Sequence, residues 1–207
     1  MDLAEQLVRH RLMAIIRGSD PAACERTAEV LVGAGVRLLE VSLISTDAFG
    51  VLTRITDSLG DEACIGAGTV LSAEDAKNAG AAGARFAVTP AASDGVAAAV
   101  ELGMPVLAGA MTPSEVLAAH RSGAAAVKLF PAESLGPRYL KALGDPFPDV
   151  GLVPVGGVDL SDVPRYLAAG ALAVGVGSPL AGDAPHGGDL AALRERAGQF
   201  LAAVGSR

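Results

Sequence analysis

The sequence is poor in aromatic residues, cysteine and positive charge, and each shortage excludes a class of protein. Aromatic residues make up 3% of the 207 residues and tryptophan is absent, so any core must consist of small and branched side chains. Cys24 and Cys64 are too few and too far apart for a disulfide framework or metal cluster, and we expect buried thiols. The net charge of −7 argues against nucleic acid or an anionic membrane as the main partner.

Long apolar runs and metal-binding patterns are also missing. No stretch reaches the roughly eighteen uncharged apolar residues of a membrane span, and the first segment, MDLAEQLVRHRLMAIIRG, has early acids unlike a secretory signal. We therefore expect a soluble, cytoplasmic protein that does not bind a membrane. His10, His120 and His186 lack the spacing of metal ligands, so we predict surface or capping roles and no metal.

Short apolar segments of strand length recur along the whole chain. They cover Leu12–Gly18, Leu38–Leu43, Ala63–Val70, Arg85–Pro90, Pro105–Ala110, Ala126–Pro131, Gly151–Gly157 and Leu172–Ser178. Between them lie helical segments that begin with capping residues, as at Ser19-Asp20-Pro21, Ser72, Thr112 and Asp159, and end with glycine, as in VLVGAGV and VELGMP. Apolar strands that alternate with helices indicate a parallel sheet buried on both faces.

Eight such units predict an α/β fold, a single-domain (β/α)8 TIM barrel over residues 1–207. The rival is an open doubly wound sheet, but the first strand ends in IIRGSDP without a glycine-rich phosphate fingerprint. A barrel places its chemistry where the strands end. The residues near those ends are Arg17, Glu40, Thr69, Thr89, Pro90, Lys128, Gly156, Gly157, Gly177 and Ser178.

Lys128 is the most unusual of these residues because it interrupts the apolar segment AAAVKLFPAE. One interpretation is structural: the stem lies on the core while the ammonium reaches water. The other is catalytic, because removing an amine from water favours the neutral form, which attacks carbonyls to give Schiff bases. Glu40, inside LLEVSL, is then either a proton shuttle near this amine or a structural ion-pair partner of Lys128.

Other residues also have two interpretations. Phe130 should point to the same side as Lys128, either to shield the amine from water or to fill the core. Thr89-Pro90 either shapes the mouth of the site or is ordinary turn chemistry. Gly156-Gly157 and Gly177-Ser178 follow the last two strands, where barrels often bind phosphate through backbone N–H groups.

The order of these motifs resembles one family, the pyruvate-dependent aldolases that cleave 2-keto-3-deoxy-6-phosphogluconate or its galactonate epimer, and also 4-hydroxy-2-oxoglutarate. The resemblance extends from AIIRG through LLEVSL, IGAGTVL, VTP, VKLFPAESLGPRYLKAL and VPVGGV to GVGS. It implies a class I aldolase without a cofactor, a keto-acid phosphate substrate and a homotrimer. It also implies that Lys128 forms the imine, that Glu40 is the acid/base, and that Thr69 contacts the pyruvyl carboxylate.

The resemblance further implies phosphate binding by Gly156, Gly157, Gly177 and Ser178. From their positions near the strand ends, we also expect Pro90 and Phe130 to contact the substrate. One departure concerns Ile44, which stands where the gluconate branch has an arginine and the galactonate branch an asparagine. Arg17 matches an arginine of the galactonate branch and is a replacement cation, unless it is merely a surface residue. A sugar-phosphate isomerase or epimerase, or a non-catalytic binding barrel, remains an alternative on the same fold.

Overall fold

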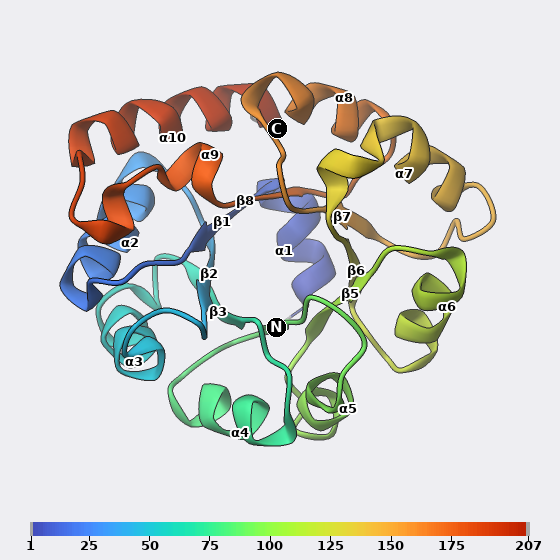
Figure 1. The fold of residues 1–207 in the computed structure, drawn as a ribbon, viewed down its shortest axis with the longest axis horizontal. Helices are drawn as coiled ribbons and strands as arrows, with labels where there is room; N and C mark the ends of the chain where they lie inside the picture. Colours follow the sequence, from blue (N-terminus) through green and yellow to red (C-terminus); the bar gives the residue numbers. More distant parts are fainter. Residues whose placement is uncertain (1, 206–207) are drawn as a thin grey trace.

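The computed structural model describes residues 2–205, which form a ring of eight parallel strands surrounded by helices (Figure 1). The strands are β1 (Leu12–Ile16), β2 (Leu38–Ser42), β3 (Cys64–Gly68), β4 (Ala87–Val88), β5 (Val106–Ala110), β6 (Ala126–Leu129), β7 (Leu152–Pro154) and β8 (Val174–Val176). Neighbouring strands pair in sequence order, and β1 also pairs with β8. The ring closes between β7 and β8 through the isolated bridge Val155↔Gly175. The predicted barrel is therefore confirmed, and an open doubly wound sheet is excluded.

The helices follow the strands around the outside of the ring. They are α1 (Leu3–His10), α2 (Pro21–Ala34), α3 (Ala48–Leu59), α4 (Ala73–Ala81), α5 (Asp94–Glu101), α6 (Pro113–Arg121), α7 (Gly136–Gly144), α8 (Val163–Ala168), α9 (Ser178–Ala181) and α10 (Leu190–Val204). Single 3-10 turns occur at η1 (Ala132–Ser134), η2 (Leu160–Asp162) and η3 (Ala184–His186). None of the helices in residues 2–205 is long and apolar enough to cross a membrane.

Most of the predicted capping residues lie at the start of a helix, as the sequence indicates. Asp20 accepts a hydrogen bond from the Ala23 N–H, and Ser72 and Thr112 each form a capping box with the acid three residues later. The glycines that end the helical segments, at 35, 83, 103, 123 and 170, all have positive φ. One start differs: Asp159 introduces the 3-10 turn η2, and α8 begins only at Val163, just before Pro164.

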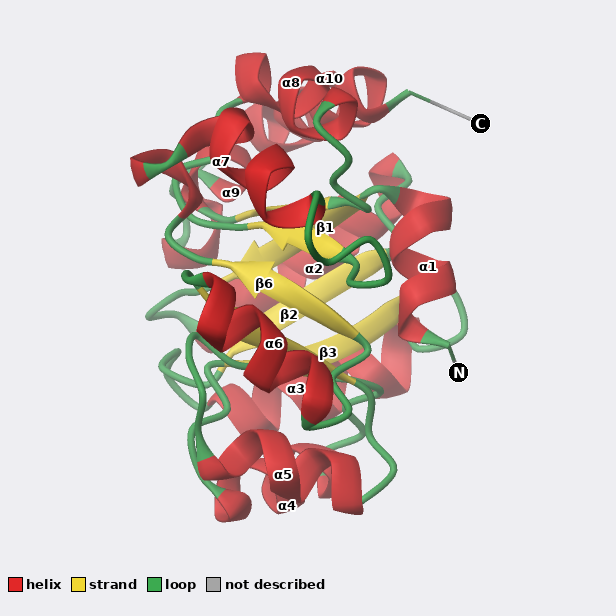
Figure 2. Ribbon diagram, turned by 90° about the vertical axis from the view of Figure 1, so that its right-hand side faces the viewer, coloured by secondary structure: helices red, strands yellow, loops and turns green. Residues whose placement is uncertain are grey.

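Two separate apolar clusters hold the barrel together. The larger lies between the strands and the outer helices, and the smaller fills the inside of the ring. The inner cluster includes Leu3 and Leu7 of α1, which covers the end of the ring where the strands begin (Figure 2). Burying each of these leucines contributes about 1.5–3 kcal/mol. That end of the barrel is thereby closed, and the opposite end is left for a site.

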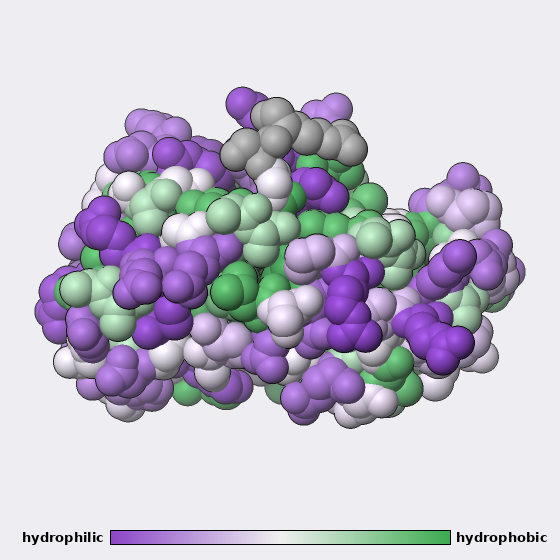
Figure 3. Space-filling view, turned by 90° about the horizontal axis from the view of Figure 1, so that it is seen from above, coloured by the Kyte–Doolittle hydropathy of each residue, from purple (hydrophilic) through white to green (hydrophobic). Residues whose placement is uncertain are grey.

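The outer surface is mixed in character. Seen from the side of α8 and α10, polar residues dominate both ends of the face, and apolar residues lie between them (Figure 3). The cysteines are buried as expected, with Cys24 at 0% and Cys64 at 7% exposure. Small side chains dominate the core, as the scarcity of aromatic residues predicts, and alanines alone account for many of its members.

Candidate functional site

Glu40 and Lys128 both point into the barrel, near the ends of their strands. Side chains alternate between the two faces of a strand. On β2, Leu38 belongs to the inner cluster and Glu40 follows two residues later; on β6, Ala126 belongs to it and Lys128 follows. Only 1% of Glu40 and 6% of Lys128 is exposed. The lysine therefore does not extend its amine into bulk water among the outer helices.

A cavity of about 460 Å³ opens where the strands end, and all the strand-end residues proposed from the sequence except Thr89 line it, together with Phe130. These residues are Arg17, Glu40, Thr69, Pro90, Lys128, Phe130, Gly156, Gly157, Gly177 and Ser178. They come from seven of the eight strands or the loops that follow them, so the fold gathers residues that are far apart in sequence. Two polar residues that line the same cavity, Ser42 and Glu133, were not among those predicted.

The Lys128 amine lies beneath an aromatic ring. Its Nζ is 5.2 Å from the centroid of Phe130, within the range of a cation–π contact. Phe130 itself remains 38% exposed, so one face of the ring covers the amine while the rest borders the cavity mouth. Phe130 and Lys128 therefore lie on the same side of the chain, as expected. Because the ring is partly exposed to solvent, packing in the core does not fully account for its position.

The Glu40 carboxyl group is held in an environment that opposes its charged form. Burial raises the pKa of Glu40 above its ordinary value, and the positive charges of Lys128 and then Arg17 lower it in part. Its Oε2 atom is buried and has no hydrogen-bond partner among residues 2–205. A buried acceptor without a donor is costly in a folded protein. Such groups collect at functional sites, where a ligand or water supplies the missing partner.

The Glu40 carboxyl group has space because the residue of β3 that lies against it, Gly68, has no side chain. A Cβ atom added to Gly68 would overlap Oε1 of Glu40. Gly68 also ends the strand that leads into Thr69, which has a φ of 64°. Positive φ is unusual for a β-branched residue and occurs mainly where the surrounding structure requires it. The segment of residues 66–69 therefore has two effects on the cavity. Gly68 leaves room for the Glu40 carboxyl group, and the positive φ of Thr69 turns that residue toward the cavity.

Ser42 and Thr69 form a pair of hydroxyl groups at the cavity wall. Their Oγ and Oγ1 atoms are 3.0 Å apart, and either can be the donor. Ser42 is 3% exposed and lies two residues after Glu40, on the same face of β2. This spacing of two was visible in the sequence and is the signal that identifies Ser42. One hydroxyl of the pair keeps a proton that it can donate to an acceptor in the cavity.

The two glycine-rich turns form the wall of the cavity beyond β7 and β8. Gly156 and Gly157 have φ values of 92° and 69°, which favour glycine. Gly157 lies against the Glu133 side chain, and Gly177 precedes the short helix α9, which starts at Ser178. Barrels of this class commonly place a phosphate between such turns and a short additional helix.

Three residues weighed in the sequence lie apart from the cavity. Thr89 is fully buried and its Oγ1 accepts a hydrogen bond from the Gly109 N–H, so it supports the barrel wall. Ile44 is 64% exposed and does not line the cavity. His186 lies on the surface, with its Nδ1 atom 3.0 Å from Ser19 Oγ. Within residues 2–205 there is no cluster of three metal-ligating side chains.

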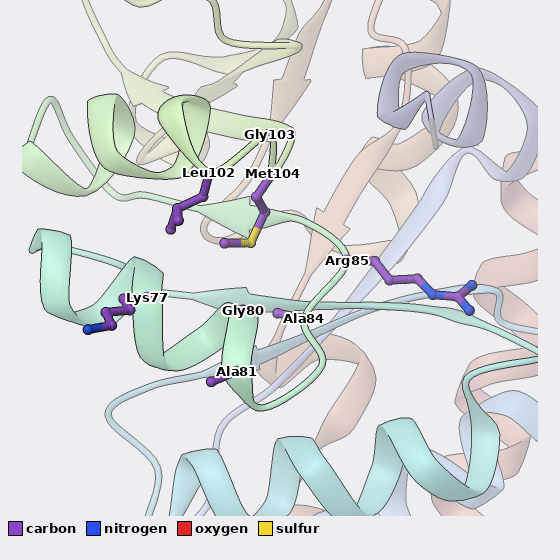
Figure 4. A pocket seen from close by; sticks show the side chains of 8 residues that line it. All are labelled: Lys77, Gly80, Ala81, Ala84, Arg85, Leu102, Gly103 and Met104. Atoms are coloured by element: carbon purple, nitrogen blue, oxygen red, sulfur yellow. The ribbon is translucent and has the colours of Figure 1, made fainter.

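A second, shallower hollow of about 380 Å³ lies between the ends of α4 and α5 (Figure 4). Leu102 and Met104 extend toward α4, whereas Lys77 and Arg85 point away from the hollow on opposite sides. Its remaining lining residues are glycines and alanines. The polar side chains that line this hollow do not point toward a common centre, so we place the candidate functional site in the cavity where the strands end.

A family model for the KDPG and KHG aldolases matches residues 3–194. The chain belongs to this aldolase family. It is 36% identical over 171 residues to the 2-dehydro-3-deoxy-6-phosphogalactonate aldolase of Escherichia coli K12, covering 82% of this chain and 83% of that one. It is 37% identical over 160 residues to the 2-dehydro-3-deoxy-phosphogluconate aldolase of Pseudomonas aeruginosa PAO1, covering 76% and 72% respectively.

Solved structures of the aldolase family agree with this fold. The structure described as "Native KDPGal structure" superposes with a TM-score of 0.86 at 33% identity, covering 93% of each chain. A KDPG aldolase from Legionella pneumophila, with pyruvate captured as a covalent carbinolamine intermediate, gives 0.87 at 27% identity and covers 94% of this chain and 96% of that one. The protein is therefore an aldolase, a carbon–carbon lyase. These matches favour it over an isomerase or a non-catalytic binding barrel.

Proposed function

We propose that this aldolase cleaves 2-keto-3-deoxy-6-phospho sugar acids of the gluconate or galactonate type, through a Schiff base, to pyruvate and glyceraldehyde 3-phosphate. The observation that carries the proposal is the position of the buried Lys128 amine in one cavity with the Glu40 carboxyl group and two glycine turns. A relative that holds pyruvate as a carbinolamine, the adduct that precedes an imine, supports the same chemistry here.

In the proposed reaction, the neutral Lys128 amine attacks C2 of the keto acid, and loss of water gives a protonated imine. The imine accepts the electron pair of the C3–C4 bond when that bond breaks, while Glu40 takes the proton from the C4 hydroxyl. The aldehyde leaves and an enamine of pyruvate remains on Lys128. Protonation at C3 and hydrolysis of the imine release pyruvate and restore the amine. The imine is itself the electrophile, so the proposed mechanism includes no metal or cofactor.

The remaining lining residues suit the two anionic ends of such a substrate. We assign the pyruvyl carboxylate to the Thr69 hydroxyl and to Arg17, which is exposed and reaches the cavity from the end of β1. The phosphate is assigned to the backbone of Gly156, Gly157 and Gly177 and to Ser178. Pro90 and Phe130 form apolar walls between them. Because Ile44 supplies no charge, Arg17 is the cation available for the carboxylate in this proposal.

Two measurements on the purified protein test the proposal. Incubation with pyruvate and borohydride should add the mass of one reduced pyruvyl group, located on Lys128 by peptide mapping. A cleavage assay coupled to pyruvate detection should show turnover of the gluconate or galactonate epimer that exceeds turnover of 4-hydroxy-2-oxoglutarate. Cleavage of 4-hydroxy-2-oxoglutarate alone, to pyruvate and glyoxylate, would replace the phosphate assignment with this second aldolase activity. Absence of the adduct would reject the Schiff base.

Changing Gly68 to alanine is expected to lower kcat by on the order of 10- to 100-fold. The added methyl group would overlap the Glu40 carboxyl group and move it away from its position facing Lys128. A displacement of about 1 Å in a catalytic group can cost this much. Gly198→Ala is the matched control, because nothing lies within 4 Å of a Cβ atom at that helical position. Equal kinetics for the two variants would show that Glu40 tolerates the methyl group or is not the proton shuttle.

We also propose that the protein works in the cytoplasm as a homotrimer. The support for an assembly is the family resemblance, together with a related chain used in a cube-shaped cage designed by fusing symmetric oligomeric domains, which is 33% identical with a TM-score of 0.87. The support for the compartment is the phosphorylated substrate, because a phosphate dianion crosses an apolar layer only at high cost. Light scattering coupled to size-exclusion chromatography measures the mass of the assembly directly.

A further inference from the structure

Glu133 places a second carboxylate in the cavity, beside the turn to which the proposed function assigns the phosphate. It belongs to η1, five residues after Lys128, and it is exposed. Its side chain packs against the α-carbon of Gly157, where a Cβ atom would overlap Oε2. A carboxylate only accepts hydrogen bonds and repels another anion. Its position next to an anion site therefore needs an explanation.

The backbone around Glu133 is fixed on several sides. The Ala132 N–H donates to Val155 O at 2.9 Å, and the Glu133 N–H donates to Gly156 O at 3.0 Å. The buried Tyr166 hydroxyl of α8 donates to Ala132 O at 2.9 Å. These bonds connect η1 to the segment just after β7 and to α8, so the carboxylate projects from a rigid support. Rigid placement is what a group that discriminates between substrates requires.

The Glu133 carboxylate has no partner of its own within the described chain. None of the ion pairs in residues 2–205 includes it, and no side-chain hydrogen bond reaches it. As an exposed carboxylate, Glu133 is hydrated in solution. A ligand that fills the cavity displaces this water and must provide a donor in return, or binding is weakened.

We infer that Glu133 determines specificity by accepting a hydrogen bond from a hydroxyl group of the aldehyde half of the substrate. This inference rests on the proposed function. A 2-keto-3-deoxy-6-phospho sugar acid bound at Lys128 and at the glycine turns carries its hydroxylated carbons between the two. Glu133 lines the same cavity and lies against Gly157, at the end of that span. 4-Hydroxy-2-oxoglutarate instead carries a carboxylate beyond C4. Glu133 repels that charge, so one residue favours the hydroxylated substrate and disfavours the dicarboxylate.

The test uses Glu133→Gln, which keeps the size of the side chain against Gly157 but removes the charge. The kcat/KM for the phosphorylated substrate should fall about 10-fold through a higher KM, because a hydrogen bond to a charged group is stronger than one to a neutral group. The kcat/KM for 4-hydroxy-2-oxoglutarate should stay level or rise. Trapping with pyruvate and borohydride should proceed at the wild-type rate, since pyruvate lacks the aldehyde half. Glu101→Gln, at an exposed position on α5, is the matched control.

Three results would overturn the inference. Equal losses on both substrates would indicate that Glu133 only supports the glycine turn. Unchanged kinetics on both would remove any role in specificity. Tighter binding of the phosphorylated substrate would mean that the carboxylate merely opposes the phosphate. A failure of the proposed function itself is recognised separately, because the wild-type protein would then form no pyruvate adduct or leave the phosphorylated acids uncleaved.

Discussion

Replacing Lys128 with alanine is expected to abolish both the pyruvate adduct and aldol cleavage, with kcat lower by on the order of 10⁴-fold or more. Removing a catalytic nucleophile has effects on this scale, because no other group can form the covalent intermediate. The described cavity offers no substitute amine, since its other cation is the guanidinium of Arg17, which stays charged and forms no imine under these conditions. Intact-protein mass after borohydride reduction measures the adduct, and the coupled assay measures cleavage.

Lys141→Ala is the matched control for this prediction. Lys141 lies on α7, where it is exposed to solvent, and its removal should leave both readouts unchanged. Lys128→Met guards against a trivial loss of folding, because it fills the same buried space under Phe130 without an amine. A variant at position 128 that keeps its circular dichroism spectrum and still gains the pyruvyl mass would reject Lys128 as the Schiff-base residue.

The barrel and most of its cavity could be predicted because short-range rules determine them. Apolar segments of strand length, capping residues such as Ser72 and Thr112, and terminal glycines each leave a local signal, and a parallel barrel places all strand ends together. Lys128 and Glu40 stood out because charged residues rarely occur inside apolar strands. Once the fold was known, the position of both residues at the strand ends followed from the alternation of side chains.

The features that were missed depend on contacts between distant segments. Glu133 enters the cavity because η1 packs on the turn after β7, a contact that no sequence spacing reveals. The predicted strand Arg85–Pro90 is shorter in the structure, where β4 covers only Ala87 and Val88. Thr89 still donates its N–H to Leu107 O, and its Oγ1 accepts a hydrogen bond from the Gly109 N–H. Ile44 replaces a polar residue of the family in the sequence, but its exposed side chain lies outside the cavity, which depends on how the loop after β2 folds.

Glu40→Gln is expected to lower kcat by about 10²- to 10⁴-fold, the usual contribution of general acid–base catalysis. Glutamine keeps the shape of the side chain but cannot accept the proton of the C4 hydroxyl. Adduct formation with pyruvate should be affected less than cleavage, because the amine and its cover by Phe130 remain. Comparing the rate of borohydride trapping with the rate of cleavage separates the two steps. A variant that cleaves at the wild-type rate would reassign the proton transfer to another group.

The same substitution should make the protein more stable at neutral and alkaline pH. Burial raises the pKa of Glu40, so the folded protein keeps this proton at pH values where the unfolded chain has lost it. The stability of the wild type therefore falls as pH rises from about 4.5, the ordinary value, through the raised one. Glutamine does not titrate, so the difference in Tm between variant and wild type should grow over that range and then level off.

Thermal unfolding followed across pH 4 to 9 tests this second effect, with Glu29→Gln at an exposed position of α2 as the surface control. A Tm for Glu40→Gln that stays below the wild type at high pH would mean that Lys128 and Arg17 stabilise the carboxylate more than burial opposes it. The expected result for Glu40→Gln is therefore lower activity together with higher stability. That combination is typical of a buried charged residue that serves catalysis while lowering the free energy of unfolding.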